Sequence, residues 1–477
     1  MLMSVFPKAI KPALEKFAPN VTTASLLLTG ILLLSLLAKL MLILQSGDPQ
    51  RSILQMEFGF GPVITSLYQR GSLEACGVAL GLDMCGVATR MPLLPALYVA
   101  LADVVGLQQT HVAIAKTILC SALLWCSAIY FCRTLARYPL NRLGLVALSA
   151  LLFLGPQYLK HAISIQYEES LLIDWLPAYF LLLGALLVRQ TAAQPLGKTE
   201  YGILAFLLLL GCSLYFLKSS MLAFSLTLTL APLVLIKVPT WFKAVAFLPF
   251  LIGLVWWGSV NYNYHGEIRL GSSYNGENLY RGQNAFSYQV YPELNLDRLI
   301  DSSEVILDNG QHLPLPNWSR HYPQFKGEWQ WHDYFKELSG KWVKENPVDA
   351  LAFTLRKIYV FFVEPRKVPF RQTTHPETEP HDYSSASLVA GMAWIVLLRV
   401  LFFIGVGRAI RDLWRYRTLS NFALWQLLFI GTYAAPYIVG FSYQRHITPM
   451  LVFSAILLLV LTVPLSQRGQ KGLQLTI

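Results

Sequence analysis

Charged side chains are scarce in this sequence of 477 residues. Asp, Glu, Lys and Arg together make up 14% of the chain, whereas 55% of its residues are hydrophobic. An average soluble domain carries roughly 25% charged residues. The composition therefore excludes an ordinary soluble domain and indicates that most of the chain lies in lipid.

Nucleotide-binding motifs are also missing. The sequence has neither a Walker loop nor a dinucleotide-binding fingerprint, which argues against ATP-driven transport by this chain. Its histidines, among them His265, His321 and His332, do not have the spacing of metal ligands. We expect no cofactor, with a divalent metal ion at the paired acids Glu168 and Glu169 as the alternative.

Long apolar runs dominate what is present. A hydrocarbon core about 30 Å thick needs about 20 apolar residues for one helical crossing. We therefore predict an all-α polytopic membrane protein with about ten transmembrane helices, interfacial helices and a small extracytoplasmic domain. The expected crossings are 22–45, 110–132, 143–159, 170–188, 202–217, 221–236, 244–261, 385–407, 421–440 and 446–464. The first run is too long for a signal peptide and lacks a cleavage site, so we expect it to be retained.

Basic residues exceed acidic ones by 38 to 27, which gives a net charge of +11. They gather between alternate crossings, as the positive-inside rule requires, so the excess calls for no nucleic-acid partner. This rule places both termini in the cytoplasm and two long segments, 46–109 and 262–384, on the opposite face. We divide the chain into an N-terminal transmembrane module (1–261), a large extracytoplasmic loop (262–384) and C-terminal transmembrane helices (385–477).

Two further apolar stretches are predicted to lie on the membrane surface. Pro92 to Leu107 contains two prolines and is interpreted as an interfacial helix, with a full crossing as the alternative. Val348 to Val363 carries Arg356 and Lys357 in its middle, and each central charge costs about 2.5–3.5 kcal/mol on insertion scales. A surface-lying helix avoids that cost.

The first extracytoplasmic loop contains Cys76 and Cys85. In an oxidising compartment two nearby thiols can pair and close a short loop. Spacing in the sequence does not fix the geometry that a disulfide needs, so free thiols are an equal alternative.

Acidic residues at loop–helix junctions of the outer face are candidates for chemistry. Asp48 and Glu57 lie in the first loop, and Glu168 and Glu169 lie in the second. Carboxylates at the membrane boundary are functional candidates by default. For Asp48, which stands in a Gly-Asp-Pro sequence, a turn is the competing role.

Cations on the same predicted face could bind an anion together. They are Arg90, Lys218, Arg356, Lys357 and Arg445, which is followed by His446. Transfer of a sugar from a lipid phosphate needs a carboxylate to take the proton of the acceptor hydroxyl and cations to stabilise the departing phosphate. Both kinds of group are present, although simple interfacial snorkelling would also explain a basic side chain there.

Five parts of the chain, in this order, resemble the bacterial GT-C-type membrane glycosyltransferases, relatives of protein O-mannosyltransferases and aminoarabinose transferases. They are ITSLYQRGSL with ATRMPLLPALYVAL, YEESLLIDWLPAYFLLLGALL, LYFLKSSMLAF, GSSYNGENLYRGQN, and NPVDALAFTLRKIYVFF with SYQRHITPM. The resemblance implies an inverting transferase in the bacterial inner membrane whose active site faces the exterior. It also implies a polyprenyl-phosphate-linked sugar donor and a glycan, lipid or protein acceptor.

The resemblance suggests a role for each candidate. Glu57 fits the position of the catalytic base best, and Asp48 is its rival because the family residue is usually Asp. The second-loop acids Glu168 and Glu169 match residues that orient the acceptor or hold a metal. The phosphate-binding candidates are Arg90, Lys218, Arg356, Lys357, Arg445 and His446, with a structural role as the alternative for His446.

Two other functions are compatible with parts of the sequence. A lipid or polysaccharide transporter should carry polar residues along a path through the bundle, and the spans are poor in acids. A non-catalytic subunit of a membrane complex would tolerate neutral replacement of Glu57, Asp48 and Arg90.

Overall fold

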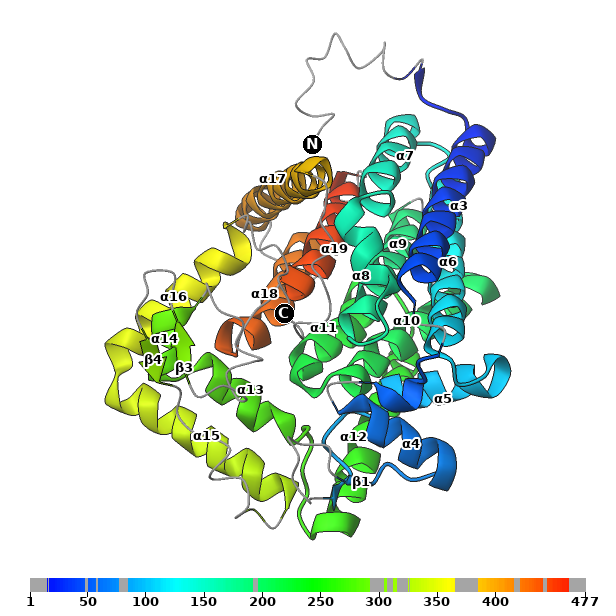
Figure 1. The fold of residues 1–477 in the computed structure, drawn as a ribbon. Coiled ribbons are helices and arrows are strands. Elements are labelled where there is room, and N and C mark those ends of the chain that lie inside the picture. Colours follow the sequence, from blue (N-terminus) through cyan, green and yellow to red (C-terminus); the bar gives the residue numbers. More distant parts are fainter. Residues whose placement is uncertain are drawn as a thin grey trace.

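The structure is a computed structural model. It describes residues 15, 17–47, 50–56, 59–76, 85–191, 196–291, 304–306, 312–314, 325, 327–364, 385–415, 421–440 and 444–462. The described chain is mainly α-helical, with long helices bundled in the upper part of the view and shorter elements gathered below (Figure 1).

Seven of the described helices are long and apolar enough to cross a membrane. They are α3 (Val21–Ser46), α6 (Gln109–Thr134), α9 (Glu169–Thr191), α10 (Lys198–Leu217), α12 (Thr240–His265), α17 (Ser385–Arg415) and α18 (Phe422–Val439). Each corresponds to a crossing expected from the sequence. The chain is therefore a helical multi-pass membrane protein.

The other three expected crossings take different forms. The run at 143–159 is broken into α7 (Pro139–Phe153) and α8 (Pro156–Ile163), whose axes differ by 63°. Pro156 explains the break, because proline has no N–H to continue the helix and disfavours helical backbone in the residue before it. The runs near 221–236 and 446–464 form the shorter apolar helices α11 (Leu222–Leu235) and α19 (Gln444–Thr462).

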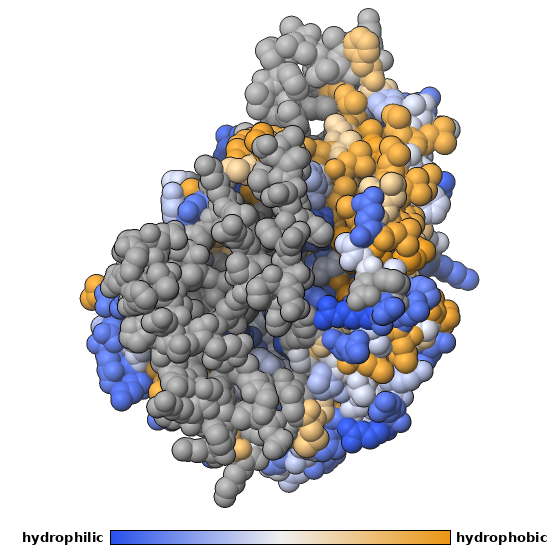
Figure 2. Space-filling model, in the orientation of Figure 1, coloured by the Kyte–Doolittle hydropathy of each residue, from blue (hydrophilic) through white to orange (hydrophobic). Residues whose placement is uncertain are grey.

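Helix α9 forms the centre of the bundle. It packs against α6, α8, α10 and α19, and 94% of its most apolar stretch is buried, compared with 28% for α3 and 22% for α12. The two peripheral helices expose apolar side chains such as Leu33 and Leu34 on α3 and Val255 on α12. Hydrophobic surface gathers around α3, at the upper right of the space-filling view (Figure 2). This surface suits contact with lipid tails.

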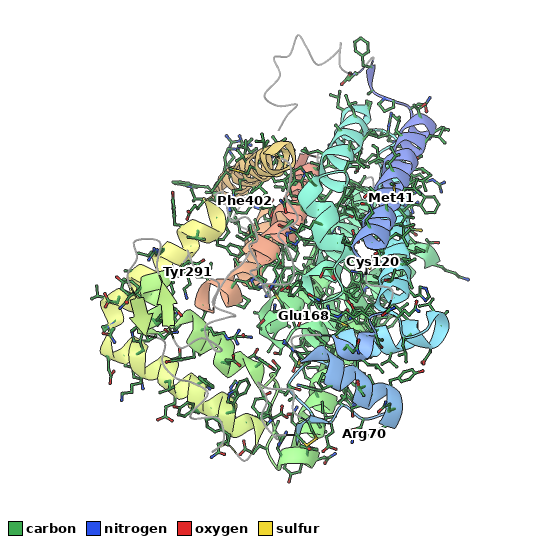
Figure 3. All side chains as sticks on the ribbon, in the orientation of Figure 1. Met41, Arg70, Cys120, Glu168, Tyr291 and Phe402 are labelled. Atoms are coloured by element: carbon green, nitrogen blue, oxygen red, sulfur yellow. A yellow bond between two sulfur atoms is a disulfide. The ribbon has the colours of Figure 1, made fainter. Side chains whose placement is uncertain are left out.

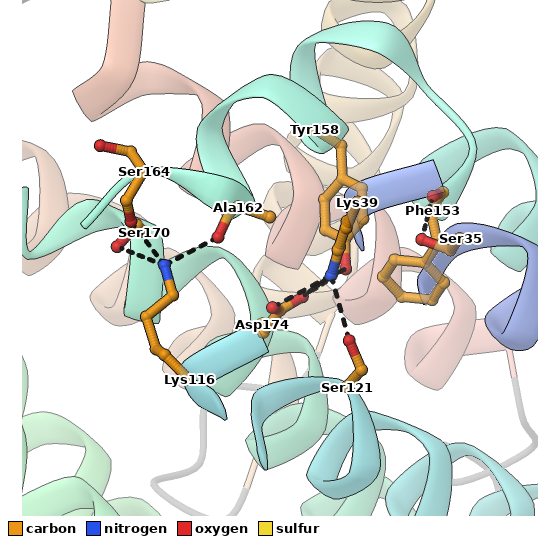
Figure 4. Close-up of polar contacts among 10 residues, drawn as sticks. All are labelled: Ser35, Lys39, Lys116, Ser121, Phe153, Tyr158, Ala162, Ser164, Ser170 and Asp174. Atoms are coloured by element: carbon orange, nitrogen blue, oxygen red, sulfur yellow. Dashed lines mark hydrogen bonds and ion pairs between the residues drawn. The ribbon is translucent and has the colours of Figure 1, made fainter. Parts of the chain in front are cut away.

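The bundle also contains buried charges that form a polar network between neighbouring helices (Figure 4). The ammonium group of Lys39 on α3 lies 3.1 Å from the carboxylate of Asp174 on α9, and both side chains are 1% exposed. Lys39 also donates to the Tyr158 hydroxyl on α8. On α6, Lys116 donates to the carbonyl of Ala162 and the hydroxyl of Ser170. Each buried charge is thus hydrogen-bonded, as burial in an apolar bundle requires.

The shorter elements lie toward the lower part of Figure 1. From the first loop come η1 (Ile53–Gln55), α4 (Phe60–Arg70), the strands β1 (Ala75–Cys76) and β2 (Cys85–Gly86), and α5 (Leu93–Val105). From the large loop come α13 (Tyr274–Gly282), α14 (Ala285–Val290), the hairpin strands β3 (Glu304–Ile306) and β4 (His312–Pro314), α15 (Glu328–Glu345) and α16 (Pro347–Phe362). Both sheets are antiparallel pairs.

Local contacts hold several of these elements together. Cys76 and Cys85 face each other across β1 and β2 and form a disulfide. Trp331 and Phe335 of α15 pack with aromatic residues of α13 into a small core of their own. Helix α16 covers the stretch that was predicted to lie on the surface, and its exposed face is apolar, with Leu351 61% and Leu355 57% exposed.

Candidate functional site

A cavity of about 630 Å³ lies where the bundle meets the shorter elements. Residues that are far apart in the sequence meet there, from Gly59 before α4 to His446 on α19. Six residues selected from the sequence line this cavity: Arg90, Glu168, Glu169, Lys218, Arg445 and His446. Glu168 lies near the centre of the molecule in the view with all side chains (Figure 3).

The carboxylate of Glu169 has three partners in the cavity wall. The ammonium of Lys218 lies 2.6 Å away, the Tyr437 hydroxyl donates at 3.2 Å, and Nε2 of His446 lies at 3.4 Å. Glu169 stands in the first turn of α9, where the helix dipole favours a negative charge. Lys218 ends α10, where a positive charge is favoured. Glu169 is therefore held as a structural anion of the cavity wall.

Glu168 differs from its neighbour. It precedes α9, lines the cavity and is partly exposed. Within the described residues its carboxylate has no hydrogen bond or ion pair. Of the two adjacent acids, Glu168 is thus the one that can contact a ligand.

Arg90 lies between two aromatic rings. Its guanidinium carbon is 4.6 Å from the centroid of Phe60 on α4 and 4.4 Å from the centroid of Tyr274 on α13. Such cation–π contacts are worth roughly 0.5–2 kcal/mol each and restrict the side chain. Arg90 therefore joins the first loop to the large loop at the cavity wall.

Arg445 enters the cavity from the first turn of α19. Its guanidinium carbon lies 4.1 Å from the ring centroid of Tyr167, and the neighbouring His446 stacks on Tyr437 with ring centroids 4.2 Å apart. A cation in the first turn of a helix adds to the positive end of the helix dipole rather than offsetting it. This arrangement favours a negatively charged ligand beside Arg445.

The large loop adds further basic groups. Arg281 and Lys336 line the cavity, and Arg281 forms an ion pair with Glu277 on the same helix. His332 also lines it and accepts a hydrogen bond at Nδ1 from the Gly276 N–H. Burial is the main cause that lowers the pKa of His332, so its charged form is disfavoured. The described lining thus has five Lys or Arg side chains against the carboxylates Glu168 and Glu169.

Two selected residues of α16, Lys357 and Arg356, are not among the described residues that line the cavity. Lys357 is buried and donates to the carbonyls of Gly282, Val439 and Gly440 at 2.7–3.0 Å, so it ties α16 to the backbone behind the cavity. Arg356 donates to the carbonyl of Tyr288. Asp48 and Glu57, which were also selected from the sequence, lie outside the described residues, although Glu57 is only two positions before the cavity residue Gly59 in the sequence.

The structure also brings forward groups that were not selected from the sequence. Tyr274 and Tyr437 support Arg90 and Glu169, and Arg281 and Lys336 add charge. Three of them, Tyr274, Arg281 and Lys336, could not be placed beside the cavity from sequence pattern alone, because polar and aromatic residues occur throughout the large loop. One feature of the sequence points to the pairing of Arg281: the acidic residue Glu277 stands four positions earlier, on the same face of a helix.

Among the described residues, the three potential metal ligands that approach one another closely are Glu74, Cys76 and Cys85. The disulfide engages both sulfur atoms of that set. At the paired acids, Glu169 is already bonded to Lys218, which leaves Glu168 as a single available carboxylate.

Comparison with known proteins adds no relative to this description. No family model matches the chain, and neither a curated protein nor a solved structure matches it significantly. We therefore infer its function from the residues of the cavity.

Proposed function

We propose that this protein is a glycosyltransferase that moves a sugar from a polyprenyl-phosphate donor to an acceptor hydroxyl. One observation carries the proposal: Arg90, Lys218, Arg445 and the available carboxylate of Glu168 line a single cavity at the edge of an apolar bundle. A lipid-linked phosphate fits that position, because its chain can stay among the apolar helices while its charge meets the basic groups.

The basic residues stabilise the departing phosphate. Arg90 and Arg445 come from opposite ends of the sequence, and each is oriented by an aromatic ring. Preorganised donors of this kind are worth most where charge develops in the transition state, and removing one typically costs about 10²–10³ in rate. Lys218 contributes less directly, because Glu169 already engages its charge.

A carboxylate accepts the proton of the acceptor hydroxyl. The hydroxyl oxygen then attacks the anomeric carbon, and the bond from that carbon to the phosphate oxygen breaks. The electron pair leaves with the polyprenyl phosphate, and the configuration at the anomeric carbon inverts. Glu57 is our leading base and Asp48 its rival. Glu168, which lines the cavity, orients the acceptor.

We place this cavity on the extracytoplasmic side of a bacterial inner membrane. The proposed topology has ten crossings, made of the seven long helices, the bent pair α7 and α8, α11 and α19. Basic residues at the connections away from the cavity support this orientation. Transport through the bundle is less well supported, because the buried charges Lys39, Lys116 and Asp174 are bonded to their neighbours and do not line the cavity.

The proposal is tested in proteoliposomes with a panel of radiolabelled polyprenyl-phosphate sugars. A bacterial envelope extract is added as the source of acceptor hydroxyls. We expect one donor to transfer its sugar to this extract, and Arg90→Ala or Arg445→Ala to slow that transfer by about 100-fold. Glu57→Gln, Asp48→Asn and Glu168→Gln distinguish the base from the orienting acid. The matched control is Lys237→Ala, since Lys237 is an exposed basic residue between α11 and α12.

Two outcomes would reject the transferase. The first is a wild-type protein that releases sugar from no donor in the panel. The second is unchanged binding of a polyprenyl monophosphate by the Arg90→Ala and Arg445→Ala variants. Either result would favour a transporter or a non-catalytic subunit as the function of this protein.

A further inference from the structure

Glu328 is a buried carboxylate that joins three distant parts of the chain. It is the first residue of α15 and is 1% exposed. One of its oxygens accepts the backbone N–H groups of Val87 and Ala88 at 2.9 and 3.0 Å and lies 2.7 Å from Nε2 of His265. The other oxygen accepts the Ser273 hydroxyl at 2.8 Å. Four donors thus converge on this carboxylate.

Two of these donors, Ala88 and Ser273, stand just before Arg90 and Tyr274, whose side chains contact each other in the cavity. Ala88 is two residues before Arg90, and Ser273 immediately precedes Tyr274. The Ser273 N–H also donates to the carbonyl of Ala88 at 2.8 Å. The backbone segments that carry Arg90 and Tyr274 are therefore attached both to each other and to Glu328.

The backbone at Gly86 passes close to the carboxylate of Glu328. A Cβ atom added at Gly86 would lie 2.4 Å from the carboxyl carbon of Glu328, well inside contact distance. A side chain at position 86 would therefore displace the Glu328 carboxylate from its present position. The carboxylate occupies space that a larger residue at position 86 would fill.

We propose that Glu328 is a positioning residue that holds Arg90 and Tyr274 at the cavity wall, so that Arg90 can bind the donor phosphate. It acts through its hydrogen bonds, because it is not among the residues that line the cavity. The phosphate-binding part of this inference rests on the proposed glycosyltransferase function. The attachment of the Arg90 segment to Glu328 does not.

The test compares variants that keep or remove the accepting oxygen. Glu328→Ala leaves the buried N–H groups of Val87 and Ala88 without their acceptor, whereas Glu328→Gln retains one oxygen for them. We expect Glu328→Ala to weaken binding of a fluorescent short-chain polyprenyl monophosphate by about tenfold, and Glu328→Gln to preserve most of it. The matched control is Glu337→Ala, at an exposed site of the same helix.

A double-mutant cycle shows whether Glu328 acts through Arg90. If it does, Glu328→Ala has little further effect once Arg90 is replaced by alanine, because the two changes remove the same contact. Multiplying effects would mean that Glu328 acts independently of Arg90, which would overturn the proposal. Binding that is unchanged in Arg90→Ala itself would instead overturn the proposed function at this site.

Hydrogen exchange gives a readout that needs no ligand. We expect amide exchange in the peptide covering 86–91 to accelerate at least about tenfold in Glu328→Ala and to stay unchanged in Glu337→Ala. If Glu328→Ala does not fold, Ser273→Ala removes a single donor and should produce the same changes at smaller amplitude. Unchanged exchange in the Glu328 and Ser273 variants would overturn the positioning role, whatever the protein binds.

Discussion

The ammonium group of Lys218 lies 2.6 Å from the carboxylate of Glu169, and the two side chains are 22% and 2% exposed. The pair connects the end of α10 to the start of α9 in the wall of the cavity. A carboxylate this deeply buried depends on its partners, because an uncompensated charge in an apolar bundle is strongly unfavourable. The ion pair therefore links the stability of the bundle to the integrity of the site.

Removing the cation of this pair should destabilise the protein. We expect Lys218→Met to lower the free energy of unfolding by about 3 kcal/mol, at the lower end for buried pairs because Lys218 is partly exposed. Unfolding in mixed detergent micelles measures the change. Adding Glu169→Gln should restore most of the loss, since the orphaned charge is gone. A double variant no more stable than Lys218→Met would contradict this explanation.

The Lys39–Asp174 pair inside the bundle should behave in the same way but leave the cavity intact. We expect Lys39→Met to cost about 3–5 kcal/mol in unfolding free energy, because it leaves Asp174 charged and buried. The apolar double variant Lys39→Met/Asp174→Leu should regain most of that stability. Binding of a polyprenyl monophosphate is the control, and a large loss of binding in the double variant would give this pair a role in the site.

Protonation of His332 should weaken the fold in mildly acidic solution. Burial is the main cause that lowers the pKa of His332 below 6.5, against a smaller raising effect of the Ser273 carbonyl. The unfolded chain then binds more protons than the folded one as pH falls through about 6.5, so this histidine reduces stability toward lower pH. We expect unfolding stability to drop less between pH 7.5 and 5.5 in His332→Gln. The exposed residue His111 provides the control variant His111→Gln, and equal slopes for both would refute the assignment.

Counting the free thiols tests the disulfide between Cys76 and Cys85. Under denaturing, non-reducing conditions we expect four of the six cysteines to be alkylated, and all six after reduction, as intact mass can show. Closing a loop of about ten residues contributes on the order of 2–3 kcal/mol in the chain-entropy description. Replacing both cysteines by serine should lower stability by a similar amount. Alkylation of six thiols without reduction would exclude the bond.

The exposed apolar face of α16 should rest in the lipid headgroup region. With Cys126 replaced by serine, a bimane label at Leu355→Cys is expected to emit at shorter wavelength in proteoliposomes and to be quenched by lipids brominated near the headgroup. The matched site is Lys344→Cys, on the exposed surface of α15. Equal quenching at both positions would argue against an interfacial helix.

Most of the long helices could be predicted from the length of the apolar runs. A backbone that crosses lipid must satisfy its own hydrogen bonds, and in a single segment only a helix does so. The bend between α7 and α8 was missed, although Pro156 within the run marks it. The single lysines at 39 and 116 were a similar overlooked signal, because an isolated charge inside an apolar run needs a buried partner.

The site was partly predictable for a related reason. Arg90, Glu168, Lys218 and Arg445 stand at ends of apolar segments, where charge is conspicuous, and all four line the cavity. Lys357 was also conspicuous, yet its position on α16 directs it toward backbone carbonyls. Which face of a helix meets which neighbour depends on tertiary packing. Neither the carbonyl contacts of Lys357 nor the hydrogen bonds that Glu328 accepts could therefore be predicted from the sequence.

The cavity wall around Glu169 also has a consequence for biosynthesis. His446 is translated about 280 residues after Glu169, an interval on the order of 14–55 s at ordinary ribosome speeds. A nascent chain must therefore hold α9 in the membrane before Lys218, Tyr437 and His446 have all reached its carboxylate. Insertion factors or early pairing of α9 with α10 would have to shield that charge, and chains arrested before α19 would present it to membrane quality control.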